Sequence, residues 1–137
     1  MADKKISQLT AVSTPLALTE ELPAVQSSTT KKVTVQQMLT GVIVTESGTT
    51  RTLASTDNGK IIYCTSGSAV TINCAASLGV GFNCTIIQGG AGKVTVAANG
   101  QTLVSYSSLF STMGQYAVIS LITPVADTFV AAGNLGV

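Results

Sequence analysis

The chain has 137 residues, of which 45% are hydrophobic and only 9% are charged, and its formal net charge is +1. An average soluble protein has about 25% charged residues, so ionic side chains are scarce here and polar uncharged ones take their place. A near-zero net charge without a basic cluster argues against a nucleic-acid binder, and together with the high content of branched apolar residues it argues against a disordered chain.

No membrane or export segment is predicted. The most apolar stretch, 116–126, is about ten residues long and contains Pro124, whereas a membrane-spanning helix needs roughly 20 apolar residues. The first residues include two lysines without an apolar segment behind them, so we expect no secretory signal.

Residues 1–41 are predicted to form an extended N-terminal arm. Pro15 and Pro23 would break a long helix. Two short apolar runs, 22–26 and 32–35, are separated by a polar segment and predict a hairpin.

The end of the arm predicts one helical turn. Thr34 and Gln37 have the spacing of a capping box, and Gly41 would end the turn. Because the arm contains too few apolar residues for a core of its own, we expect it to dock on another surface.

Residues 42–137 are predicted to form a β domain, since apolar residues recur there with period two in short runs. The predicted strands are 61–64, 69–74, 82–88, 93–97, 102–106, 115–123 and 128–132. Turn sequences separate them, and Asn99-Gly100 is the strongest hairpin signal. The pattern predicts a mainly β fold, a compact antiparallel β-sandwich or barrel that follows the arm.

Charged residues are concentrated in the first part of the chain. Eleven of the thirteen lie in the first sixty positions, which leaves only Lys93 and Asp127 for residues 61–137. Either serine and threonine cover the surface of this half, or much of it is buried against copies of the chain or another protein. We favour burial.

The residues needed for most catalytic and metal sites are missing. The absence of histidine excludes histidine-based triads and proton shuttles, and the absence of a CxxC motif argues against structural zinc. The six carboxylates, Asp3, Glu20, Glu21, Glu46, Asp57 and Asp127, are not expected to form the facing pair of a glycosidase. We therefore expect no enzymatic activity, no cofactor and no metal.

Cysteines, glycines and tyrosines have structural interpretations. Cys64, Cys74 and Cys84 are expected to be small buried hydrophobes, with a Cys64–Cys74 or Cys74–Cys84 disulfide as the alternative. The run Gly89–Gly92 lacks the GK[ST] of a phosphate-binding loop and is expected to form a tight turn. Each of the three tyrosines falls in a predicted strand, which favours a core position over a sugar-binding platform.

Two sets of motifs resemble proteins of tailed-bacteriophage virions. The N-terminal set is Lys4-x-Ile6-Ser7-Gln8-Leu9, Thr14-Pro15-Leu16, 22–26 and 30–35. The second set is 53–60, 68–72, 90–96, 114–117 and 129–135. Together they cover nearly the whole chain, which resembles the virion structural proteins that include capsid decoration proteins, head fibres and tail fibres.

This resemblance implies a homotrimer whose N-terminal module binds the virion while the β domain projects outward. A fibre needs an anchor, a shaft and a tip, but this chain has room only for an arm and one domain. We therefore expect a capsid decoration (cement) protein on the outer capsid surface of the virion. It would be made in the cytoplasm of the host bacterium, and its partner would be the major capsid protein.

The arm supplies the expected contacts with the capsid. Apolar anchors are Ile6, Leu9, Val33 and Val35, and charge contacts are Lys31 and Lys32. The alternative is a short tail fibre or adhesin that binds a glycan of the host surface. Against it stand the aromatic content of only 4% and the absence of tryptophan.

Overall fold

The computed structural model describes residues 21–26, 29–34 and 41–137, and it divides the chain into two compact units, Met1–Thr40 and Gly41–Val137. The boundary expected from the sequence lay between residues 41 and 42. No helix among the described residues is long and apolar enough to cross a membrane.

The first unit contains the hairpin that the sequence predicts. Strand β1 (Glu21–Gln26) pairs antiparallel with β2 (Thr29–Thr34), and the register joins Glu21 to Thr34 and Gln26 to Thr29. Only residues 27–28 separate the two strands, whereas the predicted runs are separated by the longer segment 27–31. The predicted helical turn falls on residues 35–40, which lie outside the described residues.

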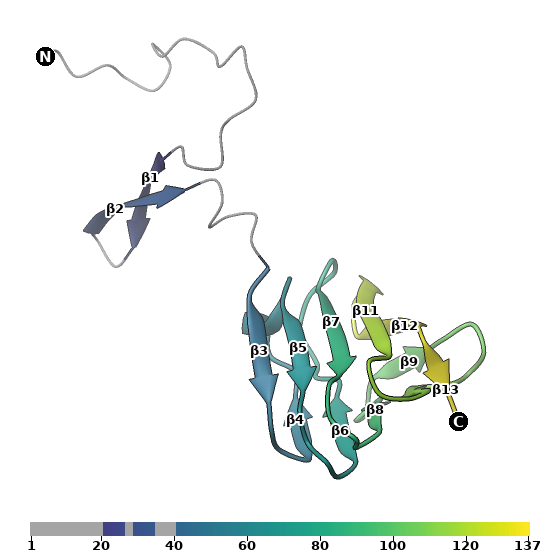
Figure 1. The fold of residues 1–137 in the computed structure, drawn as a ribbon. Coiled ribbons are helices and arrows are strands. Elements are labelled where there is room, and N and C mark those ends of the chain that lie inside the picture. Colours follow the sequence, from purple (N-terminus) through teal and green to yellow (C-terminus); the bar gives the residue numbers. More distant parts are fainter. Residues whose placement is uncertain (1–20, 27–28, 35–40) are drawn as a thin grey trace, which may run out of the picture. The chain divides into compact units, whose positions relative to one another are not determined.

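The regular secondary structure of the second unit is almost all strand, arranged in two sheets (Figure 1). The six-stranded sheet has the order β3-β5-β7-β11-β12-β9, and the five-stranded sheet has the order β13-β10-β8-β6-β4. The strands are β3 (Ile43–Glu46), β4 (Thr50–Thr52), β5 (Ile61–Cys64), β6 (Val70–Asn73), β7 (Asn83–Gln88), β8 (Val94–Ala97), β9 (Thr102–Val104), β10 (Ser111–Thr112), β11 (Val118–Val125), β12 (Thr128–Gly133) and β13 (Leu135–Gly136). A short 3-10 helix, η2 (Ser55–Asp57), lies between β4 and β5.

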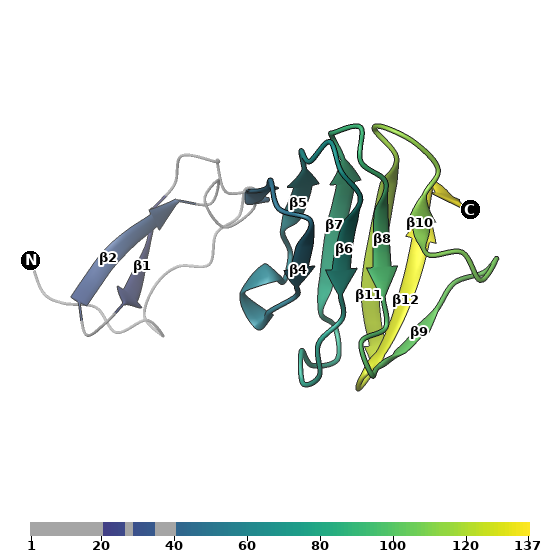
Figure 2. The same ribbon diagram turned by 90° about the horizontal axis from the view of Figure 1, so that it is seen from below.

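Strands β3 to β8 form a stack of three coils. Each coil contributes one strand to each sheet, so the chain crosses from one sheet to the other at every turn. Strands of successive coils are therefore parallel: β3 with β5 and β5 with β7 in one sheet, and β4 with β6 and β6 with β8 in the other. Figure 2 shows the strands of one sheet lying over those of the other.

The prediction of a mainly β domain is confirmed, but the antiparallel sandwich or barrel is wrong. The first six strands are stacked as in a β-solenoid, and antiparallel pairing in this unit begins where β10 joins β8 and β11 joins β7. The remaining strands close the stack: β12 pairs antiparallel with β11, β10 with β8, and β13 with β10, while β9 runs parallel to β12.

The Asn99-Gly100 turn is present, but it does not make a hairpin. Both residues have positive φ, at 48° and 87°, and the Gln101 N–H donates to the Ala98 carbonyl at 2.9 Å. The strands on either side, β8 and β9, belong to different sheets. A two-residue turn fixes the local reversal of the chain but not the partner of each strand.

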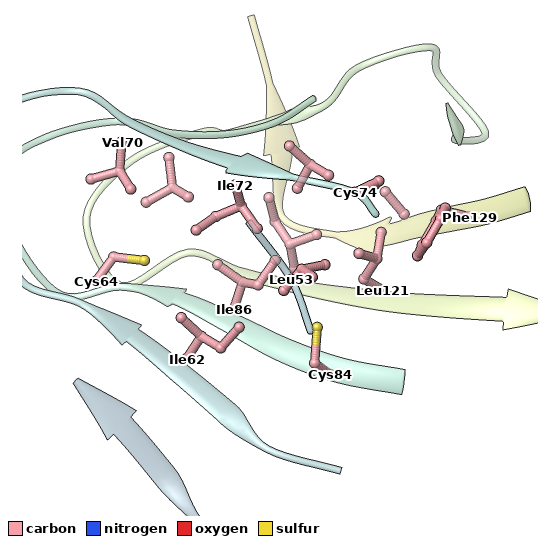
Figure 3. Packing of buried hydrophobic residues seen from close by; sticks show 14 of the residues in the cluster. Leu53, Ile62, Cys64, Val70, Ile72, Cys74, Cys84, Ile86, Leu121 and Phe129 are labelled. Carbon is pink, nitrogen blue, oxygen red and sulfur yellow. The ribbon is translucent and has the colours of Figure 1, made fainter. Parts of the chain in front are cut away.

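The core fills the space between the two sheets (Figure 3). It consists of alternate residues of successive coils, which lie directly above one another in register, such as Ile62 beside Ile86 and Ile72 beside Val96. Phe82 and Phe129 meet edge to face with ring centroids 6.5 Å apart. Burial of such side chains stabilises a domain by about 1.5–3 kcal/mol each, so the stack depends on close contact between coils.

Candidate functional site

The first coil carries charges at positions that are apolar in the second. Glu46 pairs with Cys64 in the ladder, and Arg51 pairs with Ile72, and both of these partners belong to the buried core. Within the described unit the first coil has a neighbouring coil on one side only. An inward-pointing charge at such an end discourages pairing with another sheet edge.

Arg51 joins two carboxylates in this cluster. Its Nη1 lies 3.1 Å from Glu46 Oε2, and its Nη2 lies 2.7 Å from Asp57 Oδ1. Asp57 is only 1% exposed, and its second oxygen accepts a hydrogen bond from the Ala54 N–H at 3.0 Å. Burial of the guanidinium works against its charge, but the hydrogen bonds to Asp57 and Glu46 outweigh this effect and raise the pKa of Arg51.

This cluster is suited to a structural role. A guanidinium lies between the two carboxylates, so they do not face each other across a space that could hold a substrate, as a glycosidase pair does. Within the described residues, no group of three histidine, cysteine or acidic side chains lies close enough together to hold a metal ion.

The cysteines are buried and free, which confirms their interpretation as small hydrophobes. Burial raises the pKa of Cys64 and of Cys74 to about 11, and that of Cys84 to about 12. Because the thiolate is the reactive form of cysteine, these side chains are suited to packing and not to catalysis.

A second set of buried polar side chains is formed by Gln88 and Thr112, which bond to each other inside the core. The Thr112 side chain, 0% exposed, accepts a hydrogen bond from the Val94 N–H at 3.0 Å and donates to Gln88 Oε1. Gln88 Nε2 in turn donates to the Gly90 carbonyl at 3.2 Å. These bonds connect β10 to the third coil.

The predicted tight turn at Gly89–Gly92 is a bend between β7 and β8, and its main feature is close contact with the coil before it. The Gly89 and Gly90 N–H groups both donate to the Cys64 carbonyl, at 2.7 and 2.9 Å. A Cβ at Gly90 would lie 2.2 Å from the Ser66 carbonyl oxygen, and one at Gly92 would lie 1.9 Å from the Ser68 oxygen. The glycines let the corner of the third coil lie directly on the corner of the second.

The prediction that all three tyrosines lie in strands is wrong for two of them. Tyr63 lies in β5, but Tyr106 and Tyr116 lie in turns. Tyr106 is fully exposed, and Tyr116 is 69% exposed with a left-handed φ of 65°. A bulky residue at positive φ is uncommon, and the Tyr116 N–H is held by a 2.7 Å hydrogen bond to the Gln88 carbonyl. The predicted strand 115–123 began too early because the apolar run 116–119 starts within the turn.

The predicted capsid-contact residues fall in the first unit. Lys31, Lys32 and Val33 lie in β2, where they pair with Ala24, Pro23 and Leu22 of β1. Ile6, Leu9 and Val35 lie outside the described residues. The structure therefore places three of the six on one strand of the hairpin.

The outer face of the six-stranded sheet, which we call the apolar face, carries no charge. Its side chains are the outward-pointing members of the alternating strands, and register arranges them in three rows across the sheet. The rows are Thr45-Tyr63-Ile87-Val118, Ile43-Ile61-Thr85-Ser120-Ala132 and Asn83-Ile122-Val130-Val104.

The outer face of the five-stranded sheet, which we call the hydroxyl face, has a different chemistry. One row across it is Thr50-Thr71-Thr95-Ser111, and the next is Thr52-Asn73-Ala97. The hydroxyls of Thr95 and Ser111 lie 2.9 Å apart. No charged side chain lies in these two rows, and their polar groups can bond to water. The two broad faces of the unit are thus the surfaces that distinguish it, and neither resembles a catalytic cleft.

No protein-family model matches the chain, and no curated protein matches it significantly.

Proposed function

We propose that the protein is a structural component of a bacteriophage virion, a homotrimeric capsid decoration protein that binds the assembled shell and stabilises it. The resemblance of both sets of sequence motifs to virion proteins supports this proposal. So does the division of the chain into a small N-terminal unit and a closely packed β unit. In this function the first unit contacts the major capsid protein and the second unit projects from the outer surface.

The observation that carries the proposal is the pair of broad sheet faces whose rows of outward side chains contain no charge, on a unit made of stacked coils. Such a body suits permanent assembly more than encounters in solution, where charged surfaces keep proteins apart. A protein that binds only the assembled shell stabilises it by mass action.

The first test is the copy number in purified virions, measured by quantitative mass spectrometry against the major capsid protein. A number commensurate with the capsid lattice is expected. A few copies per particle would place the protein at the tail or a unique vertex, and absence from clean particles would refute a virion role.

A second test uses the two lysines of β2. The variant Lys31→Glu/Lys32→Glu is expected to lose binding to shells assembled without the protein, measured by co-sedimentation. The control Lys60→Glu/Lys93→Glu makes the same change in net charge but lies in the β unit, and it is expected to bind normally. Equal binding by the two variants would contradict the role of the hairpin.

A glycan-binding function is the second candidate, favoured by the exposure of Tyr106 and Tyr116 in turns. Exposed aromatic rings are a common platform for sugars, since one face is apolar and the hydroxyl is polar. Reproducible binding on a glycan array, lost in Tyr116→Ala, would support an adhesin in place of a decoration protein.

A further inference from the structure

We propose that the apolar face of the six-stranded sheet is the surface through which copies of this chain associate, with three apolar faces packed around a common axis. This proposal deepens the proposed function and rests on its homotrimer, but it needs no capsid for its test. It identifies one of the two broad faces as the interface.

Burial of the apolar face would remove more apolar surface from water than burial of the hydroxyl face. Nine of the thirteen positions in the three rows of the apolar face are apolar: Ile43, Ile61, Tyr63, Ile87, Val104, Val118, Ile122, Val130 and Ala132. The hydroxyl face has no large apolar side chain on its strands. Removal of apolar surface from water is the main driving force of association, so the apolar face is the one that gains from burial.

Charge indicates which partner covers it. An ordinary protein surface contains charged groups, and burial of such a group against an uncharged face leaves it unpaired at a high cost. None of the outward positions on the apolar face is charged, and residues 61–137 contain only Lys93 and Asp127. A second copy offers the same uncharged face, so no charge is buried on either side.

The width of the sheet suits three copies. Six strands make five spacings of about 4.8 Å, which gives a sheet about 24 Å wide. Three such sheets, arranged as the sides of a triangular prism, would each lie about 7 Å from the central axis. Sheets packed face to face are about 10 Å apart, so side chains reach about 5 Å from each sheet. Isoleucine, valine and tyrosine side chains of the central strands would fill most of the interior.

Ile87 lies on a central strand of this face, in the Thr45-Tyr63-Ile87-Val118 row. It belongs to β7, its register neighbours across the sheet are Tyr63 and Val118, and it is half-buried in the single chain. In the assembly, Ile87→Lys would bring three positive charges together in an apolar interior. Thr71 is the matched control: it is half-buried on a central strand, β6, of the hydroxyl face.

The experiment measures the mass of the full chain in solution, without capsid, by light scattering during size-exclusion chromatography. We expect the wild-type chain and Thr71→Lys to have the mass of three copies. Ile87→Lys is expected to require at least about a hundredfold higher concentration to associate. A monomeric wild-type chain, or equal behaviour of the two variants, would overturn the proposal.

A second pair of variants tests the same interface even if Ile87→Lys does not fold. Thr85 lies in the middle row of the apolar face, and Thr95 lies in the Thr50-Thr71-Thr95-Ser111 row of the hydroxyl face. Since burial leaves Cys64, Cys74 and Cys84 unreactive, a thiol introduced by Thr85→Cys is the one that a short bismaleimide can reach. Crosslinked oligomers from Thr85→Cys and none from Thr95→Cys are expected, and the reverse would overturn the proposal.

The two proposals can fail separately. Loss of trimers in Ile87→Lys with shell binding retained would leave the capsid function standing. Normal trimers that do not bind shells would leave the interface standing and refute decoration of the capsid.

Discussion

Replacement of Gly92 by alanine tests the contact between coils most directly. The added Cβ would lie 1.9 Å from the Ser68 carbonyl oxygen and 2.4 Å from the Ser68 carbonyl carbon, both backbone atoms of the second coil. A Cβ contact below 3.0 Å essentially never occurs, so the two corners must separate by at least 1.1 Å, the difference between 3.0 and 1.9 Å. No flexible side chain can move aside to absorb this shift.

The cost follows from that separation. Gly92 does not have a left-handed φ, so alanine can adopt its backbone conformation and the clash is the only penalty. Overpacking of a tight contact costs about 1–3 kcal/mol. The shift also strains the 3.1 Å hydrogen bond from the Gly92 N–H to the Ser66 carbonyl, which contributes about 1 kcal/mol. We expect Gly92→Ala to lower the free energy of unfolding by about 3 kcal/mol.

The control is Gly67→Ala, in the same corner of the second coil. A Cβ there meets no atom within 4 Å, and the φ of Gly67 is not left-handed. This variant is expected to be neutral or to gain up to about 1 kcal/mol, since alanine reduces the entropy of the unfolded chain.

Urea denaturation followed by circular dichroism measures both variants, at one protein concentration because association would shift the midpoint. For a unit of this size, 3 kcal/mol corresponds to a fall in Tm of at least about 10 °C. A Gly92→Ala protein within about 0.5 kcal/mol of wild type would refute the close stacking of the two corners and, with it, the parallel arrangement of β5 to β8.

Three further predictions concern buried polar groups and thiols. Arg51→Met is expected to lower the free energy of unfolding by about 2–3 kcal/mol, because it leaves the Asp57 carboxylate buried without its partner. Glu46→Gln changes a more exposed carboxylate and should cost less than about 1 kcal/mol. Equal losses of the two variants in urea titrations would contradict the role of the buried ion pair. Thr112→Val is expected to cost about 2 kcal/mol, because the Val94 N–H and Gln88 Oε1 lose their hydrogen bonds to the threonine hydroxyl. Thr112→Ser keeps both bonds and should retain at least half of that stability. The native cysteines are expected to resist iodoacetamide at pH 8 and to react fully in urea, since burial raises their pKa values from 9.0 to about 11 or 12. The same shift makes the free energy of unfolding depend on pH: the contribution of the thiols is complete below pH 9 and is lost as the pH rises toward 11, because the thiols of the unfolded chain ionise first.

The sequence by itself determined where most strands and turns lie. Alternation of apolar and polar residues located β5 to β8, β11 and β12, because a strand that buries one face must place an apolar side chain at every second position. Asn99-Gly100 was correctly identified as a turn, and the glycines of 89–92 were correctly placed in a connection between strands. The apolar run 116–119 begins within a turn, so the local sequence placed the exposed ring of Tyr116 in a strand.

The sequence indicated only part of the charged cluster of Glu46, Arg51 and Asp57 in the first coil. Arg51 was one charge among thirteen, with Thr50 and Thr52 on either side, and only the fold places Glu46 and Asp57 against it. Strands β3 and β4 were not predicted, and an inward charge on each breaks the apolar pattern at the first coil.

Only the tertiary structure decided how the strands pair. Period two says that alternate side chains face inward, and this is equally true of parallel and antiparallel strands and of either sheet. The choice depends on whether each connection returns to its own sheet or crosses to the other. That in turn depends on contacts between residues far apart in the chain, such as Gly92 against Ser68 and Ile62 beside Ile86. The free energy of these contacts is absent from any local window of sequence, and it is what makes a stack of coils from strands that fit a sandwich equally well.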